Sequence, residues 1–164
     1  MSKIAIIYGS SSGTAEDIAK KIKQKLGNAD LFNIYKLDLD KVKDYDFYIL
    51  GTSTTGFGEV QEDWESALPK FAALDFSGKK AAIFGVGDSA SYSDSFVGSM
   101  SVIYNELKDK LDFVGAVSTE GYDFDDSESV VDGQFVGLAI DEDNESDKSD
   151  ERIDAWLETI KSDF

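Results

Sequence analysis

The side chains that could take part in chemistry in this chain are mainly hydroxyls and carboxylates, because the sequence contains no histidine and no cysteine. The commonest general base is therefore missing, and disulfides, thiolate chemistry and cysteine metal sites are excluded. Hydroxyl residues instead occur in short runs beside glycines, and the first run reads Ser10-Ser11-Ser12-Gly13-Thr14-Ala15. Neutral hydroxyl donors of this kind can bind a polar ligand by hydrogen bonds.

The first run lies between a short apolar segment, residues 4–8, and a segment with apolar residues at helical spacing, residues 15–26. Backbone N–H groups at the start of that predicted helix, together with the helix dipole, favour an anion. The run contains no lysine or arginine and matches neither a Walker motif nor a G-x-G-x-x-G motif. A phosphate monoester held by neutral donors fits best, although an ordinary helix start capped by serine remains an alternative.

A second run, residues 52–59, contains Thr54, Thr55, Gly56, Phe57 and Gly58. Its two glycines permit unusual backbone angles or the close approach of a flat ligand, and Phe57 is a candidate for the flank of such a ligand. Taken alone, the run could equally be an ordinary connection between a strand and a helix.

A third run, residues 85–94, contains Gly87, Asp88 and the single aromatic residue Tyr92. A tyrosine can stack on a planar ring while its hydroxyl stays in water. Asp88 could accept a hydrogen bond from a ring N–H group. The alternative is a tyrosine that only packs on the protein surface.

Each run follows a segment that is predicted to be a buried strand, namely residues 4–8, 47–50 and 80–84. A weaker strand is predicted at residues 31–35 and a fifth begins at residues 113–117. Helical spacing is found at residues 15–26, 62–74, around 102–107 and at 150–162, and Pro69 lies inside the second of these segments. We expect Val102, Ile103 and Leu107 to form the core face of the third. Strands and helices that alternate in this way predict a doubly wound parallel sheet with helices on both faces.

In such sheets ligands bind beyond the carboxyl ends of the strands. We therefore expect the three runs to meet at one site. One segment breaks the alternation, because some thirty residues separate Val117 from the last predicted helix and residues 135–140 again resemble a strand. We interpret residues 118–134 as an insertion that splits the fifth strand.

The formal net charge is −17, from 16 basic and 33 acidic residues. Such a charge disfavours nucleic acid as a partner and could steer the protein toward basic partners. No apolar run approaches the roughly 18 residues of a membrane span, and the four apolar residues near the start are too few for a signal peptide. We expect a single domain over residues 1–164, a monomer located in the cytoplasm.

The three runs, in this order and at these spacings, resemble the flavodoxin family, and the resemblance covers essentially the whole chain. It is carried by Gly9–Gly13, Gly58–Trp64, Phe84–Asp88 followed by Tyr92, Gly121–Phe124 and Phe135–Asn144. The last two stretches resemble the long-chain subgroup, in which an insertion splits strand five. The resemblance implies a flavodoxin-like α/β fold with strand order 2-1-3-4-5.

It also implies a cofactor, FMN, and a function as a low-potential one-electron carrier between redox enzymes rather than as an enzyme. Ser10, Ser11, Ser12, Gly13, Thr14 and the Ala15 backbone would hold the phosphate, and Tyr92 would stack on the flavin. Thr54, Thr55, Gly56, Phe57 and Gly58 would flank the ring, with the Gly56 carbonyl accepting a hydrogen bond from it. Gly87 and Asp88 would contact the pyrimidine edge. The implied partners are basic-surfaced redox enzymes, with no nucleic acid, membrane or metal.

Two positions depart from the family pattern. Ala15 stands where a threonine is usual, and Thr55 stands where many members have a tryptophan. The inner ring face could therefore be covered by Thr55 or by Phe57, or be more open.

Two other functions share this pattern of elements. A flavodoxin-like quinone reductase would need a second nucleotide site, for which the sequence offers no evident candidate. A phosphoacceptor receiver domain would need clustered acids after the first strand and an aspartate after the third. Those places hold Ser10–Ser12 and Thr52–Thr55 instead.

Overall fold

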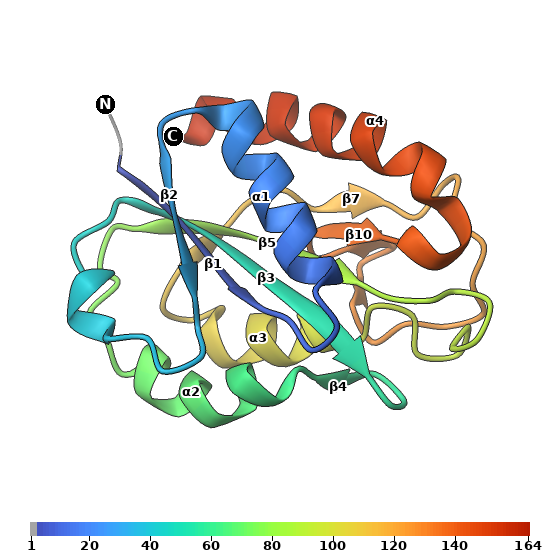
Figure 1. The fold of residues 1–164 in the computed structure, drawn as a ribbon, viewed down its shortest axis with the longest axis horizontal. Helices are drawn as coiled ribbons and strands as arrows, with labels where there is room; N and C mark the ends of the chain where they lie inside the picture. The colour runs from blue at the N-terminus through green and yellow to red at the C-terminus, as the bar shows by residue number, and fades with distance from the viewer. Residues whose placement is uncertain (1–2) are drawn as a thin grey trace.

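The computed structural model describes residues 3–164, and its centre is a parallel sheet (Figure 1). The order along the sheet is β10-β5-β3-β1-β2, formed by β1 (Ile4–Gly9), β2 (Ala29–Asn33), β3 (Phe47–Thr55), β5 (Lys80–Val86) and β10 (Leu138–Ile140). The second strand of the chain therefore lies at one edge, beside the first, as predicted. β1 and β3 are almost entirely buried, which explains their continuous apolar stretches.

α-Helices cover both faces of the sheet (Figure 1). α1 (Thr14–Leu26) and α4 (Glu142–Ile160) pack on one face, and α2 (Glu62–Ala72) and α3 (Ser99–Leu107) pack on the other. Each face has its own apolar cluster, with Trp64, Phe71 and Ile103 in one and Ile18, Ile153 and Trp156 in the other. Within residues 3–164, no helix is both long and apolar enough to cross a membrane.

The fifth strand is split, as predicted, but the split is wider than expected. β6 (Asp112–Phe113) pairs with the start of β5, and β10 pairs with its end. Between them, β7 (Val117–Ser118), β8 (Val130–Val131) and β9 (Gln134–Phe135) form a separate antiparallel sheet of order β7-β9-β8. Val117 and Phe135 pair with each other in this small sheet rather than with β5.

The prediction that residues 135–140 form one strand is therefore wrong at its start. Pairing with β5 resumes only after Gly137, whose backbone lies against the Ile83 carbonyl. A Cβ atom at Gly137 would stand 2.0 Å from that oxygen, so only glycine lets the chain re-enter the sheet here.

Three helix predictions also need correction. Val102 was expected on the core face of α3 but is 37% exposed, while Met100 and Ile103 are fully buried. α4 begins at Glu142 rather than near residue 150, because the buried Asp141 caps its N-terminus by accepting a hydrogen bond from the Asn144 N–H group. The first turns of α4 are polar, so apolar periodicity could not reveal them. Pro69 lies inside α2, which ends at Ala72 rather than at Leu74.

Candidate functional site

The first hydroxyl run connects β1 to α1 and forms the start of that helix. Gly13 occupies the N-cap position with a φ of 94°, a left-handed conformation that suits glycine. No side chain caps the helix, although the Ser10 hydroxyl accepts a hydrogen bond from the Gly13 N–H group at 3.0 Å. The N–H groups of the first helical turn are thus not capped by a side chain, as an anion-binding helix start requires.

The burial of side chains changes along this run. Ser11 and Ser12 are exposed, whereas Ala15 is fully buried in the core beneath α1. A ligand at this helix start could reach only the backbone of Ala15. Glu16, an acid in the first turn, accepts a hydrogen bond from the Tyr8 hydroxyl at 3.1 Å and lies 3.3 Å from the Lys20 ammonium group.

The second run forms a hairpin rather than a simple loop. β3 extends to Thr55 and pairs with β4 (Glu59–Val60), so that Thr55 stands opposite Glu59. At the hairpin tip Gly56 and Gly58 have φ angles of 51° and 92°. Phe57 between them is 84% exposed, which is unusual for a phenylalanine.

The third run is a loop organised around Asp88. Its carboxylate accepts hydrogen bonds from the N–H groups of Ala90 and Ser91, at 3.2 and 3.1 Å, and its carbonyl accepts one from the Tyr92 N–H group at 2.9 Å. Tyr92 is 43% exposed, and its ring meets that of Phe57 edge to face at a centroid distance of 6.1 Å. The two exposed aromatic rings predicted to flank a planar ligand therefore come from different loops and lie side by side.

All three runs contribute to one cavity of about 170 Å³ at the carboxyl ends of the strands. Its walls include Ser12, Thr14, Thr54, Gly87, Asp88 and Tyr92, which were predicted. Ser10, Ser11, Gly13, Ala15, Thr55, Gly56, Phe57 and Gly58 belong to the same three runs but do not line this cavity. A larger hollow of about 440 Å³ lies between α4 and the insertion, yet none of the three runs reaches it.

The cavity also contains site residues that sequence reasoning missed. Ser53 and Ser95 line it, and the hydroxyls of both are buried without a hydrogen-bond partner. Asp143, from the first turn of α4, lines it too. An unpaired buried hydroxyl is costly, so these two serines are suited to bind a polar ligand. The signal that could have found Asp143 is its place just after β10, at the same edge of the sheet.

Three carboxylates gather beside the cavity. The oxygens of Asp88, Asp141 and Asp143 lie within 4.8 Å of one another, close enough to hold a metal ion. However, Asp88 and Asp141 already accept hydrogen bonds from the Asn144 amide, at 2.8 and 2.9 Å. The Asn144 bond is the main cause that lowers the pKa of Asp88, whereas burial, followed by the nearby carboxylates, raises the pKa of Asp143.

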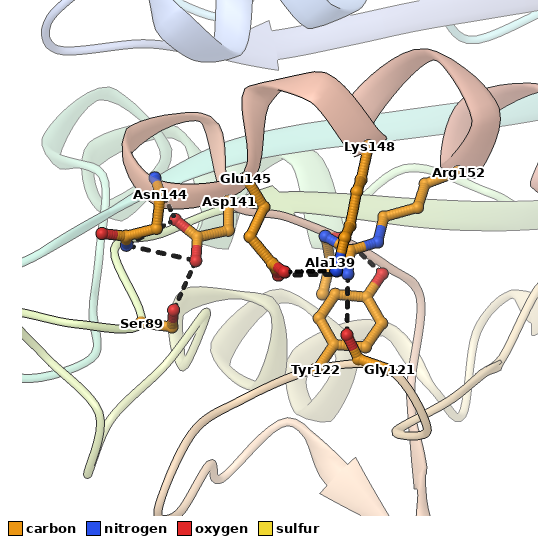
Figure 2. A network of polar contacts seen from close by, with 9 residues as sticks. All are labelled: Ser89, Gly121, Tyr122, Ala139, Asp141, Asn144, Glu145, Lys148 and Arg152. Carbon is orange, nitrogen blue, oxygen red and sulfur yellow. Dashed lines mark hydrogen bonds and ion pairs between the residues drawn. The ribbon is translucent and has the colours of Figure 1, made fainter.

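Figure 2 shows the polar contacts of Asp141 and of Glu145 in the first half of α4. Asp141 is fully buried and also accepts a hydrogen bond from the Ser89 hydroxyl. Glu145 lies 2.8 Å from the Lys148 ammonium group and 3.1 Å from the Arg152 guanidinium group. The Arg152 guanidinium carbon lies 3.9 Å from the centroid of the Tyr122 ring. This stacking holds the insertion against α4.

Comparisons with known proteins agree in their result. The sequence model of one family, described as Flavodoxin, matches residues 6–156. Flavodoxin 1 of Azotobacter vinelandii is 42% identical over 171 residues, with 100% of this chain and 98% of the relative covered. A flavodoxin of Helicobacter pylori is 41% identical over 164 residues, covering 100% and 99%.

The solved structures give the same result. The crystal structure of a Fusobacterium nucleatum flavodoxin bound to flavin mononucleotide has a TM-score of 0.94 to this chain at 30% sequence identity. The match covers 100% of this chain and 99% of that one. Flavodoxin 2 of Bacillus cereus is similar at a TM-score of 0.75 and 26% identity, covering 99% of each chain.

Proposed function

The chain belongs to the flavodoxin family and is an FMN-dependent electron carrier rather than an enzyme, and we propose that its three hydroxyl-rich loops hold one FMN for low-potential, one-electron transfer. The observation that carries this proposal is the single cavity that all three loops line. FMN supplies the redox chemistry when it is bound, and the protein supplies binding and tuning.

The residues around the cavity fit FMN in chemistry. Neutral hydroxyls and an uncapped helix start suit its phosphate, and the buried, unpaired hydroxyls of Ser53 and Ser95 suit a polyhydroxyl chain. Tyr92 and Phe57 provide exposed rings for a planar ring system. Because Thr55 is engaged in the hairpin with Glu59, we assign the second flank of the ring to Phe57.

Each loop has a separate task in this proposal. Residues 10–15 bind the phosphate through hydroxyls and backbone N–H groups. The tip residues Gly56–Gly58 flank the ring and place the Gly56 carbonyl near it, while Gly87 and Asp88 contact its polar edge. The carboxylates around the cavity disfavour added negative charge, which keeps the reduction potential low.

Titration of the apoprotein with FMN and with riboflavin tests the phosphate role. We expect tighter binding of FMN, and we expect the double variant Ser12→Ala/Thr14→Val to weaken FMN binding about tenfold. Riboflavin binding should stay unchanged in that variant. Ser66→Ala, at an exposed serine of α2, is the matched control. Equal affinity of the parent protein for both ligands would remove the phosphate role from this loop.

The proposal includes a single domain over residues 1–164, a monomeric state, a cytoplasmic location and basic-surfaced redox partners. Both apolar clusters lie against the same sheet, which supports one domain. The charge of −17 keeps copies of the chain apart and attracts basic surfaces. Light scattering of the purified protein tests the monomer, and cell fractionation tests the location.

A further inference from the structure

The loop that carries Tyr92 has no helix or strand of its own between Val86 and Ser99. Its first half folds around Asp88, which accepts hydrogen bonds from Ala90, Ser91 and Tyr92 of the same loop. Bonds of this kind fix the shape of the loop but do not fix where the loop stands relative to the sheet. The loop is attached elsewhere at Ser89, whose hydroxyl donates to Asp141, and at Ser93, whose carbonyl accepts hydrogen bonds from the Asp125 and Asp126 N–H groups. The Asp88 carboxylate, around which the first half of the loop folds, needs an attachment of its own.

Asn144 provides that attachment. Its side-chain amide donates to the Asp88 carboxylate at 2.8 Å and to the Asp141 carboxylate at 2.9 Å. Within residues 3–164, the Asp88 carboxylate accepts hydrogen bonds from Ala90 and Ser91 of its own loop and, from outside the loop, from the Asn144 amide alone. The bond links positions that are 56 residues apart in the sequence.

The far end of this link is rigid. Asp141 is fully buried, caps α4 and binds both the backbone N–H group of Asn144, at 3.2 Å, and the Ser89 hydroxyl (Figure 2). The next residue, Glu145, departs from helical geometry with a φ of −134° and a ψ of 40°, and it is held by Lys148 and Arg152. The first turn of α4 is thus fixed on both sides of Asn144.

A neutral amide is the side chain that this position requires. Asn144 faces two carboxylates, and its two N–H donors can satisfy both without adding a charge. An aspartate of the same shape would lose both donors and add a negative charge to a cluster that already contains Asp88, Asp141 and Asp143. A leucine would lose the donors alone.

We propose that Asn144 is a positioning residue, which bridges Asp88 and the buried Asp141 and thereby holds the Asp88–Tyr92 loop ready for the flavin. This inference rests on the proposed function, because it assumes that Tyr92 meets the flavin ring. Asn144 itself is an exposed residue and does not line the cavity, so it acts through Asp88. The apparent affinity of a ligand that needs the held loop falls in proportion to the fraction of molecules in which the loop is held.

The test uses Asn144→Leu and Asn144→Asp, with Asn105→Leu and Asn105→Asp as matched controls at an exposed asparagine of α3. The first measurement is amide hydrogen exchange of the full-length apoprotein. We expect faster exchange at Ala90, Ser91 and Tyr92 in both Asn144 variants, and more in Asn144→Asp. The controls should exchange like the parent. Thermal unfolding of each apoprotein shows that the fold is intact.

The second measurement is the affinity for FMN and for riboflavin. We expect both to fall about tenfold in Asn144→Leu and by the same factor, because the loop contacts the ring and not the phosphate. Unchanged exchange and unchanged affinities in the Asn144 variants would overturn the inference, as would a loss confined to FMN. If the parent protein fails to bind FMN, the proposed function fails, while the exchange experiment still decides whether Asn144 holds the loop.

Discussion

Tyr92 and Phe57 come from different loops, yet their rings meet edge to face and both remain exposed. Exposed aromatic rings are costly in water unless a ligand or a partner covers them. The glycine-rich runs that surround each ring predicted both residues as flanks of a planar ligand. Their contact could not be predicted, because it depends on the distance between the ends of β3 and β5.

Replacement of Tyr92 by alanine tests its role as a flank. Loss of stacking, worth about 0.5–1.5 kcal/mol beyond burial, should weaken FMN binding about threefold to tenfold. The lower midpoint potential should rise by roughly 20–60 mV, because an electron-rich ring no longer opposes reduction of the flavin. Redox titration of Tyr92→Ala beside Tyr92→Phe and the exposed control Tyr35→Ala measures this. A Tyr92→Ala protein with the parent's potentials would refute the assignment.

The site residues that escaped prediction share one property. Ser53, Ser95 and Asp143 line the cavity, and Asn144 binds Asp88 beside it. All four are ordinary polar residues whose surroundings make them notable. Nothing in a local pattern distinguishes a buried, unpaired hydroxyl from a solvated one. Ser12, Thr14, Asp88 and Tyr92 could be predicted because they lie in runs that end predicted strands, and the parallel sheet brings such runs together. Ser53 lies in one of these runs as well, but only its burial without a hydrogen-bond partner marks it.

At the scale of the elements, the alternation of strands and helices predicted a parallel sheet with helices on both faces, and the resemblance to the flavodoxin family implied the strand order. The insertion that splits the fifth strand was predicted too, but the small sheet inside it was not, because β7, β8 and β9 are only two residues long and lack periodicity. The start of α4 was hidden for a related reason. It is set by the buried Asp141 cap and by the kink at Glu145, while the apolar residues that reveal the helix begin at Ile153.

The central sheet also contains a close fit that gives a stability prediction. Gly51 of β3 stands opposite Phe84 of β5, and a Cβ atom at Gly51 would lie 1.9 Å from the Phe84 ring. We expect Gly51→Ala to lower the free energy of unfolding by about 1–3 kcal/mol through overpacking. Chemical denaturation of the apoprotein measures this effect.

A second substitution identifies the cause. Phe84→Leu removes the ring that the new methyl group would strike, so the double variant Gly51→Ala/Phe84→Leu should be more stable than the sum of the two single effects predicts. Additive losses would mean that Gly51 is needed for a reason other than the ring.

For the whole molecule, the sequence gives the size of the charge but not its arrangement. Glu62 and Glu65 follow β4, which pairs with the carboxyl end of β3, so they lie at the same edge as the candidate site. Both are exposed. Glu106 and Asp109 are also exposed but precede β6, which pairs with Lys80 at the opposite end of β5. The two acidic pairs therefore lie at opposite ends of the parallel strands.

These two pairs decide whether the negative charge serves docking at the site. Electron transfer to a basic reductase, measured by stopped flow, should slow as salt rises, because exposed charges are screened over about 8–10 Å at physiological ionic strength. Glu62→Lys/Glu65→Lys should flatten this dependence and slow the transfer at low salt. Glu106→Lys/Asp109→Lys changes the net charge by the same amount at the opposite end of the strands. It should change the salt dependence and the rate at low salt much less. Equal effects of the two double variants would mean that the charge acts as a whole, through solubility and overall attraction, and that no docking surface surrounds the site.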